Sequence, residues 1–229
     1  MDELVRYIKF SIAFDTDKLK SDLAKIINKN WIDHYNTNGY SGKWTSVALM
    51  SKDGKSDSIY ALPSDDDKMM DTEILDSCTY FKEVLDGFLF EKTAVRLLQL
   101  AVGAEIKPHS DHCLGYEDGS FRLHIPIITN PDVEFILDDK RLIMNEGECW
   151  YIDANFIHSV ANRGKQDRIH LVIDGIRNDW SDALFFKEAA ENRFLKPKAK
   201  MSEEQKELMI AELKRMDTTV AQEILKNLE

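Results

Sequence analysis

The sequence is poor in cysteine and has no long apolar run. Cys78, Cys113 and Cys149 are odd in number, widely spaced and never arranged as the paired C-x-x-C of a zinc site. No apolar stretch approaches the ~18 residues of a membrane span. The start, MDELVRYIKF, lacks the basic residues and the small-residue cleavage site of a secretory signal. We therefore expect a soluble, cytoplasmic protein with reduced, buried thiols.

Positive charge is also scarce. The 229 residues carry a formal net charge of −11, which opposes binding to nucleic acid because that binding depends on basic residues that neutralise phosphates. The basic run KPKAK at 196–200 is short and is typical of a solvated linker. We expect neither nucleic acid nor a membrane as a partner.

The sequence pattern in the middle of the chain is typical of an antiparallel sandwich or barrel. A strand is expected over 5–12, a helix begins after Asp15 or Thr16, and apolar spacing of three and four predicts a helix over 72–85. Short apolar segments separated by turn residues then fill 93–176, and their even spacing favours an all-β core.

The end of the chain returns to helical patterns. Two stretches, 202–216 and 219–228, begin with capping-box patterns and carry apolar residues at helical spacing. We therefore expect a β domain over 1–179 and a helical C-terminal extension over 180–229. The extension would pack on the barrel mouth as a lid or form a homodimer contact.

One short stretch, IKPHSDH, offers two metal ligands. If it is extended, His109 and Asp111 leave the same face of the strand, whereas His112 points elsewhere. The tripeptide H-x-D alone is weak evidence for a metal site, since the same two residues would also be found in a hydrogen-bonded pair at the end of a strand. His112 would replace Asp111 as a ligand only if the strand bulges there.

Two residues further along make the pattern more specific. His158, in DANFIHSVAN, supplies a third ligand, and two histidines with one carboxylate form the facial triad of non-haem iron oxygenases. Arg168 follows ten residues later on RIHLVID, and its guanidinium suits the distal carboxylate of an oxo-acid cosubstrate. Period two places Arg168, His170 and Val172 on one face of that strand.

The strand FRLHIPI places Arg122 and His124 on one face, opposite three apolar residues. If this face points inward, the two polar groups are costly to bury unless they meet an anion. The alternative is an outward face whose charges pair with surface carboxylates.

Together these motifs resemble the aspartyl/asparaginyl β-hydroxylase family of iron(II)/2-oxoglutarate dioxygenases, which also contains bacterial proline hydroxylases. The resemblance rests on H-x-D, the distal histidine, the arginine ten residues after it and the R-L-H-I-P strand. It extends from GYSGKWTSVALMS, which begins at Gly39, through VRLLQLAVGAEIKPHSDH to about Asp174.

The resemblance implies a double-stranded β-helix (jelly-roll, cupin-like) core and a set of site residues. Fe(II), 2-oxoglutarate and O2 are the implied cofactors, and an amino acid or peptide is the implied substrate. Iron would be held by His109, Asp111 and His158, the 2-oxoglutarate distal carboxylate by Arg168 and its inner carboxylate by His124. Arg122 would contact the cosubstrate or a substrate carboxylate.

Some assignments stay open at this stage. The presence of Asp111 separates the chain from the two-histidine aspartyl hydroxylases and favours the proline-hydroxylase-like branch. Arg96 and Trp44 are weaker candidates for substrate binding, and Trp44 is most simply a core aromatic. The rival functions are a non-catalytic cupin-like barrel that binds a metal or small acid, and a protein-interaction module that uses the tail helices.

Overall fold

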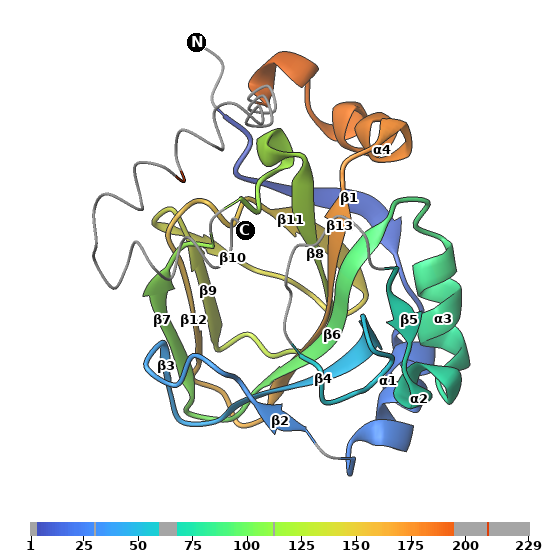
Figure 1. Cartoon of the computed structure of the whole chain (residues 1–229). Coiled ribbons are helices and arrows are strands. Elements are labelled where there is room, and N and C mark those ends of the chain that lie inside the picture. Colours follow the sequence, from blue (N-terminus) through green and yellow to red (C-terminus); the bar gives the residue numbers. More distant parts are fainter. Residues whose placement is uncertain (1–3, 30, 60–67, 112, 195–209, 211–229) are drawn as a thin grey trace. The chain divides into compact units, whose positions relative to one another are not determined.

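The computed structural model describes residues 4–29, 31–59, 68–111, 113–194 and Ile210 (Figure 1). The chain divides into two compact units, Met1–Lys196 and Pro197–Glu229. The helices expected within 202–228 lie outside the described residues, except for Ile210, which is helical. In the part that the structure describes, no helix is both long and apolar enough to cross a membrane.

Antiparallel strands form two sheets. The larger sheet has the order β1-β11-β8-β13-β6-β4-β2, with β5 paired to β4, and the smaller sheet has the order β10-β9-β12-β7-β3. The strands are β1 (Tyr7–Ala13), β2 (Ile32–Asp33), β3 (Tyr40–Ser41), β4 (Trp44–Ser51), β5 (Met70–Asp71), β6 (Lys92–Leu100), β7 (Glu105–His109), β8 (Ser120–Ile128), β9 (Val133–Leu137), β10 (Lys140–Leu142), β11 (Glu148–Ile152), β12 (His158–Asn162) and β13 (Arg168–Ile176).

The chain passes back and forth between the two sheets from β6 onward. Strands β6, β8, β11 and β13 belong to the larger sheet, whereas β7, β9, β10 and β12 belong to the smaller one. Two facing four-stranded sheets, β6-β13-β8-β11 and β7-β12-β9-β10, are the arrangement of a double-stranded β-helix, or jelly roll. The predicted fold class is confirmed.

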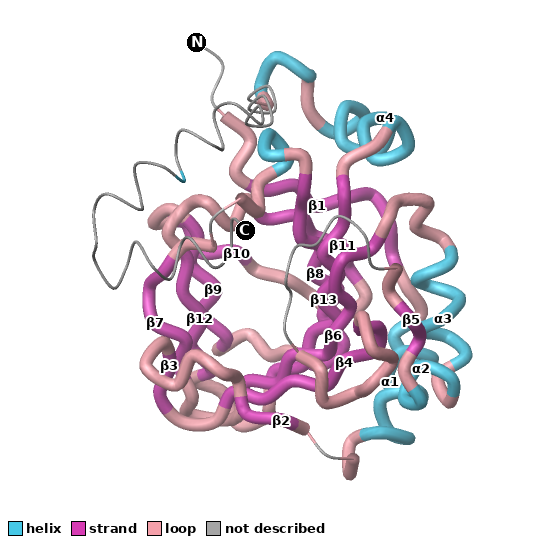
Figure 2. Tube along the Cα trace, in the orientation of Figure 1, coloured by secondary structure: helices cyan, strands magenta, loops and turns pink. Residues whose placement is uncertain are grey.

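Alternation along the strands separates two apolar cores. On β13, Ile169, Leu171 and Ile173 belong to the core outside the larger sheet, and Val172 belongs to the core between the sheets. The first core also contains the buried faces of the helices, which lie beside the larger sheet (Figure 2). The period-two prediction for this strand is confirmed, and it directs Arg168 and His170 into the barrel.

The helices are α1 (Thr16–Ile26), α2 (Glu73–Asp76), α3 (Thr79–Asp86) and α4 (Asp179–Glu188). Asp15 is the N-cap of α1, where its carboxylate accepts hydrogen bonds from two backbone amides. The single helix predicted over 72–85 is wrong, because the chain is interrupted between α2 and α3. The Ser77 hydroxyl donates to the Ile74 carbonyl (2.7 Å), and Asp22 of α1 accepts from the backbone amide of Tyr80 (2.7 Å) at the start of α3.

The cysteines differ from one another in environment. Cys78 and Cys149 are buried thiols, as expected, but Cys113 is exposed and has a positive φ of 59°. Its place in the loop after β7, outside any strand, explains why an expectation based on average cysteine burial is wrong there.

Candidate active site

Two histidines from neighbouring strands of the smaller sheet face each other. His109 ends β7 and pairs in register with His158, which begins β12. The Nδ1 atom of His109 lies 2.8 Å from the Lys107 carbonyl oxygen, and Nδ1 of His158 lies 3.0 Å from that of Phe156. Both backbone contacts fix the rings so that the Nε2 atoms are left for a ligand.

A carboxylate completes a compact group of three possible metal ligands. Asp111 follows β7 by two residues, and the ligand atoms of His109, Asp111 and His158 all lie within 4.8 Å of one another. This is the set that the sequence singled out. The structure therefore brings the three residues together at the open end of the smaller sheet, where His109 and Asp111 are partly exposed.

The protonation states of this group suit a divalent cation. Burial lowers the pKa of His158, so its imidazole is neutral at pH 7 and has a lone pair to donate. Burial alone would raise the pKa of Asp111, but the charge and hydrogen bond of Arg122, together with the two histidines, outweigh it and hold the pKa of the carboxyl below its ordinary value. Two histidines and one carboxylate fit divalent iron and leave coordination positions free.

Arg122 connects the candidate ligands to the larger sheet. Its Nη1 lies 2.6 Å from Oδ2 of Asp111, and its Nε lies 2.6 Å from Oδ1 of Asp174 on β13. Arg96, on β6, donates to the other oxygen of Asp174 at 2.8 Å. Arg122 therefore faces the barrel interior, as one of the two alternatives predicted, and a buried aspartate shared with Arg96 fixes its position.

Asp174 was not among the predicted site residues. Period two along β13 continues from Arg168 through His170 and Val172 to Asp174, so the signal was present in the sequence. Arg96 is 6% exposed and its Nη1 donates to the Ile59 carbonyl at 3.2 Å. Arg96 therefore helps to fix the position of the Asp174 carboxylate through their ion pair.

Arg168 is a buried cation without an anion. It is 2% exposed, has no carboxylate partner among the described residues, and its Nε has no hydrogen-bond partner. Its Nη2 lies 2.8 Å from Nδ1 of His170, so that atom of the imidazole is the acceptor. Burial lowers the pKa of Arg168 to about 9, which still leaves a full positive charge at neutral pH.

His124 is a second buried group with unused hydrogen-bonding capacity. Neither ring nitrogen has a partner, and the imidazole is 5% exposed. Burial and the charge of Arg168 lower its pKa well below the ordinary value, so it is neutral. A buried cation and a neutral imidazole, both unsatisfied, fit a small dicarboxylate such as 2-oxoglutarate.

An aromatic cluster lies close to these charges. The ring of His34 stacks on Trp44 with centroids 3.5 Å apart, and Tyr35 stacks on its other side at 4.4 Å. Burial, with the charge of Arg96, lowers the pKa of His34 to about 4. Trp44 thus belongs to the inner core, as the simpler prediction had it, and its buried indole Nε1 has no hydrogen-bond partner.

Two further histidines, His34 and His112, were not assigned to the metal site from the sequence. No role was predicted for His34, which follows the first helix, and the structure stacks its ring on Trp44. His112, considered above as an alternative ligand, lies outside the described residues.

Asp153, in the turn before β12, makes folding stability depend on pH. It is 2% exposed, and burial with the neighbouring Glu117 carboxylate raises its pKa from 3.8 to about 7. The folded state therefore binds a proton that the unfolded state lacks between about pH 4 and pH 7, so this group's contribution to stability falls as pH rises through that window.

We expect Asp153→Asn to remove that contribution. Relative to wild type, the free energy of unfolding of the variant should be higher at about pH 8 than at about pH 4, as measured by urea denaturation. A wild-type-to-variant difference that stays constant with pH would show that Asp153 is ionised in the folded state.

Comparison with known proteins identifies a family for this chain. A model of the aspartyl/asparaginyl β-hydroxylase family matches residues 13–178. The chain is 30% identical over 166 residues to an L-proline cis-4-hydroxylase of Rhizobium meliloti, covering 71% of this chain and 58% of that protein. It is 25% identical over 169 residues to an L-proline cis-3-hydroxylase of Streptomyces, covering 71% and 57%.

The matches differ in how much of each protein they cover and in how closely the structures superpose. The chain spans less than two thirds of the length of both curated relatives. Among solved structures, a prolyl-4-hydroxylase of Pseudomonas putida has a TM-score of 0.48 at 10% identity, covering 76% of this chain and 94% of that one.

Proposed function

The chain belongs to the aspartyl/asparaginyl β-hydroxylase family, and from this premise we propose that it is an Fe(II)- and 2-oxoglutarate-dependent dioxygenase. The reaction is hydroxylation of an unactivated C–H bond, coupled to decarboxylation of 2-oxoglutarate to succinate and CO2. The observation that carries the proposal is that one barrel holds two groups of side chains whose capacity to bind a ligand the protein itself does not use. These are the His109, Asp111 and His158 ligand set and the buried, unpaired Arg168.

Each part of the site has a separate task. When bound, iron with 2-oxoglutarate supplies the oxygen activation that no amino-acid side chain can provide. His109, Asp111 and His158 hold the metal, while Arg122 restrains the second oxygen of Asp111. Arg168 neutralises the distal carboxylate of the cosubstrate, and His124 donates to its inner carboxylate. The apolar core between the sheets, in which Arg168 and His124 are buried, keeps water away from the cosubstrate.

The substrate we propose is a free amino acid resembling proline. The names of the curated relatives support this class, and the partly exposed Arg122 beside Asp111 is suited to a substrate carboxylate. A carrier-bound or peptidyl amino acid would lack that free carboxylate. Turnover of such substrates in preference to the free acid would refute this part of the proposal.

A spectroscopic titration tests the activity. Anaerobic Fe(II) with 2-oxoglutarate should give a weak charge-transfer band at about 500 nm, because the oxo acid chelates a metal with open positions. Exposure to O2 with L-proline should then give succinate and hydroxylated product in equal amounts. Absence of the band in wild type would favour a binding barrel, and an unchanged band in His109→Ala would place the metal elsewhere.

We expect Arg122→Leu to weaken amino-acid binding selectively. Loss of one charged partner costs about 2 kcal/mol or more, so the KM for proline should rise at least ~30-fold. The Kd for 2-oxoglutarate should change little, since Arg168 and His124 are intact. Arg122→Lys keeps the charge and should recover part of the loss, and an equal change in both constants would show that Arg122 serves the cosubstrate.

A further inference from the structure

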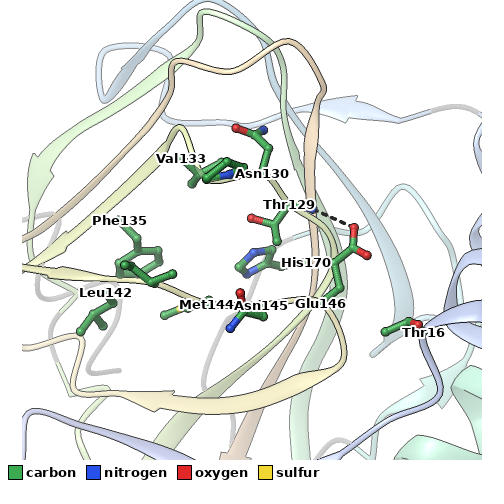
Figure 3. A pocket seen from close by; sticks show the side chains of 12 residues that line it. Thr16, Thr129, Asn130, Val133, Phe135, Leu142, Met144, Asn145, Glu146 and His170 are labelled. Carbon is green, nitrogen blue, oxygen red and sulfur yellow. Dashed lines mark hydrogen bonds between the residues drawn. The ribbon is translucent and has the colours of Figure 1, made fainter.

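A cavity opens on the barrel near the ends of β8 and β10. It has a volume of about 460 Å³ and lies between Thr129–Pro131, which follow β8, and Ile143–Glu146, which join β10 to β11 (Figure 3). This size is within the ~300–1,000 Å³ typical of ligand pockets. None of the three candidate metal ligands lines it.

The cavity runs from the surface to the barrel interior. At its rim Ile143 is 69% exposed, whereas Phe135 and His170 at its base are 3% and 1% exposed. Figure 3 shows the His170 ring among the lining side chains, below Thr129 in this view. Nε2 of His170 is buried and has no hydrogen-bond partner, so a polar side chain at the base has an unused donor.

The two side chains at the base of the cavity also lie next to the residues that we propose bind 2-oxoglutarate. His170 accepts from Arg168 at 2.8 Å, and the Phe135 ring lies 5.8 Å from the Arg168 guanidinium. The same Phe135 ring lies 5.8 Å from the ring of His124. Phe135 and His170 therefore stand between the cavity and both residues that we propose hold 2-oxoglutarate.

The opposite end of the barrel is crossed by an ion pair. Arg122 on β8 reaches Asp111, which follows β7 in the other sheet, and Asp174 fixes the guanidinium. Bound amino acid would occupy this end, because it must meet the metal there. A cosubstrate that entered the same way would have to pass the Arg122–Asp111 pair and then lie behind the substrate.

We infer that the cavity is the route by which 2-oxoglutarate reaches Arg168 and by which succinate leaves, with Phe135 and His170 as its gate. This inference rests on the proposed function. The lining suits an anion in transit, since its only charged residue among those described, Glu146, pairs with Lys20 at 2.5 Å. Its carboxylate also accepts from the Thr129 amide (Figure 3).

A route and a binding site differ in one measurable way. Narrowing a route slows association and dissociation by the same factor, so the Kd does not change, because the path cannot alter the equilibrium. Damage to a binding site changes the Kd. The two rate constants for 2-oxoglutarate therefore decide between these roles without any turnover.

Tryptophan at the rim tests the route. Ile143→Trp adds bulk at an exposed lining position, and Thr129→Trp adds it on the opposite side. Val102→Trp is the matched control, since Val102 is 49% exposed in the turn after β6 and does not line the cavity. Anaerobic stopped-flow mixing of each Fe(II)-loaded protein with 2-oxoglutarate gives both rate constants from the band at about 500 nm.

The expected result is a decrease of at least ~3-fold in both rate constants for Ile143→Trp, a larger decrease for the double variant, and an unchanged Kd. Val102→Trp should match wild type. Unchanged rates in the double variant at full band amplitude would overturn the route, and so would a changed Kd. Failure of the proposed function looks different, because wild type itself would then show no band.

Discussion

Arg168→Met should strongly weaken 2-oxoglutarate binding and at the same time stabilise the fold. The distal carboxylate loses its only proposed cationic partner, which costs about 2–5 kcal/mol, or a roughly 30- to 5,000-fold higher Kd. The free protein, however, buries this guanidinium without an anion. A methionine of similar length removes that unfavourable charge and keeps the packing against Phe135.

The measurement compares thermal unfolding with and without cosubstrate. In the absence of ligands the variant should exceed wild type by about 1 kcal/mol or more in the free energy of unfolding. Addition of Fe(II) and 2-oxoglutarate should raise the Tm of wild type only. Arg163→Met, at an exposed arginine paired with Glu105, is the control and should change neither quantity appreciably. A destabilised Arg168→Met protein would mean that Arg168 has a compensating partner in the free state.

The barrel interior contains three arginines in two different electrostatic situations. Arg96 and Arg122 share the carboxylate of Asp174, and Arg122 also pairs with Asp111, so two carboxylates compensate these two charges within the protein. Arg168, at the start of the strand that carries Asp174, lies against the neutral imidazole of His170 and has no carboxylate partner among the described residues. A charge left uncompensated in the free protein is what a site for an anionic ligand requires, which is why Arg168 is the residue where function and stability oppose each other.

Much of this site could be predicted because strand geometry is simple. Alternation with period two placed His109 with Asp111, Arg122 with His124, and Arg168 with His170, and the structure directs these groups into one barrel. The same rule, followed two residues further, would also have identified Asp174. Family membership was predicted from the resemblance of these motifs to the family, and the family model matches residues 13–178.

Other features depend on contacts that no local pattern reports. The stacking of His34 on Trp44 joins residues on either side of β3, and the Glu117 carboxylate that raises the pKa of Asp153 comes from a separate segment of the chain. The interruption between α2 and α3 is another example, because Asp22 of a different helix accepts the amides that start α3. The cavity behind Phe135 and His170 exists only once two loops have been placed.

The second large effect is expected for His158→Ala. Loss of hydrogen-bond partners around a metal ligand already costs 10- to 100-fold in affinity, so loss of the ligand itself should lower Fe(II) affinity by more than ~100-fold. The 2-oxoglutarate band and hydroxylation should disappear together. The fold should persist, since His158 is buried and burial lowers its pKa, so a neutral imidazole rather than a charged group is removed.

His34→Ala is the matched control for that experiment. Both residues are buried imidazoles with lowered pKa values near the same charges, but the ring of His34 stacks on Trp44 and is not part of the ligand set. Metal affinity, measured by anaerobic titration, should therefore fall in His158→Ala and stay near wild type in His34→Ala. Equal losses in both variants would trace the effect to general loosening of the site, and retained affinity in His158→Ala would remove this residue from the metal centre.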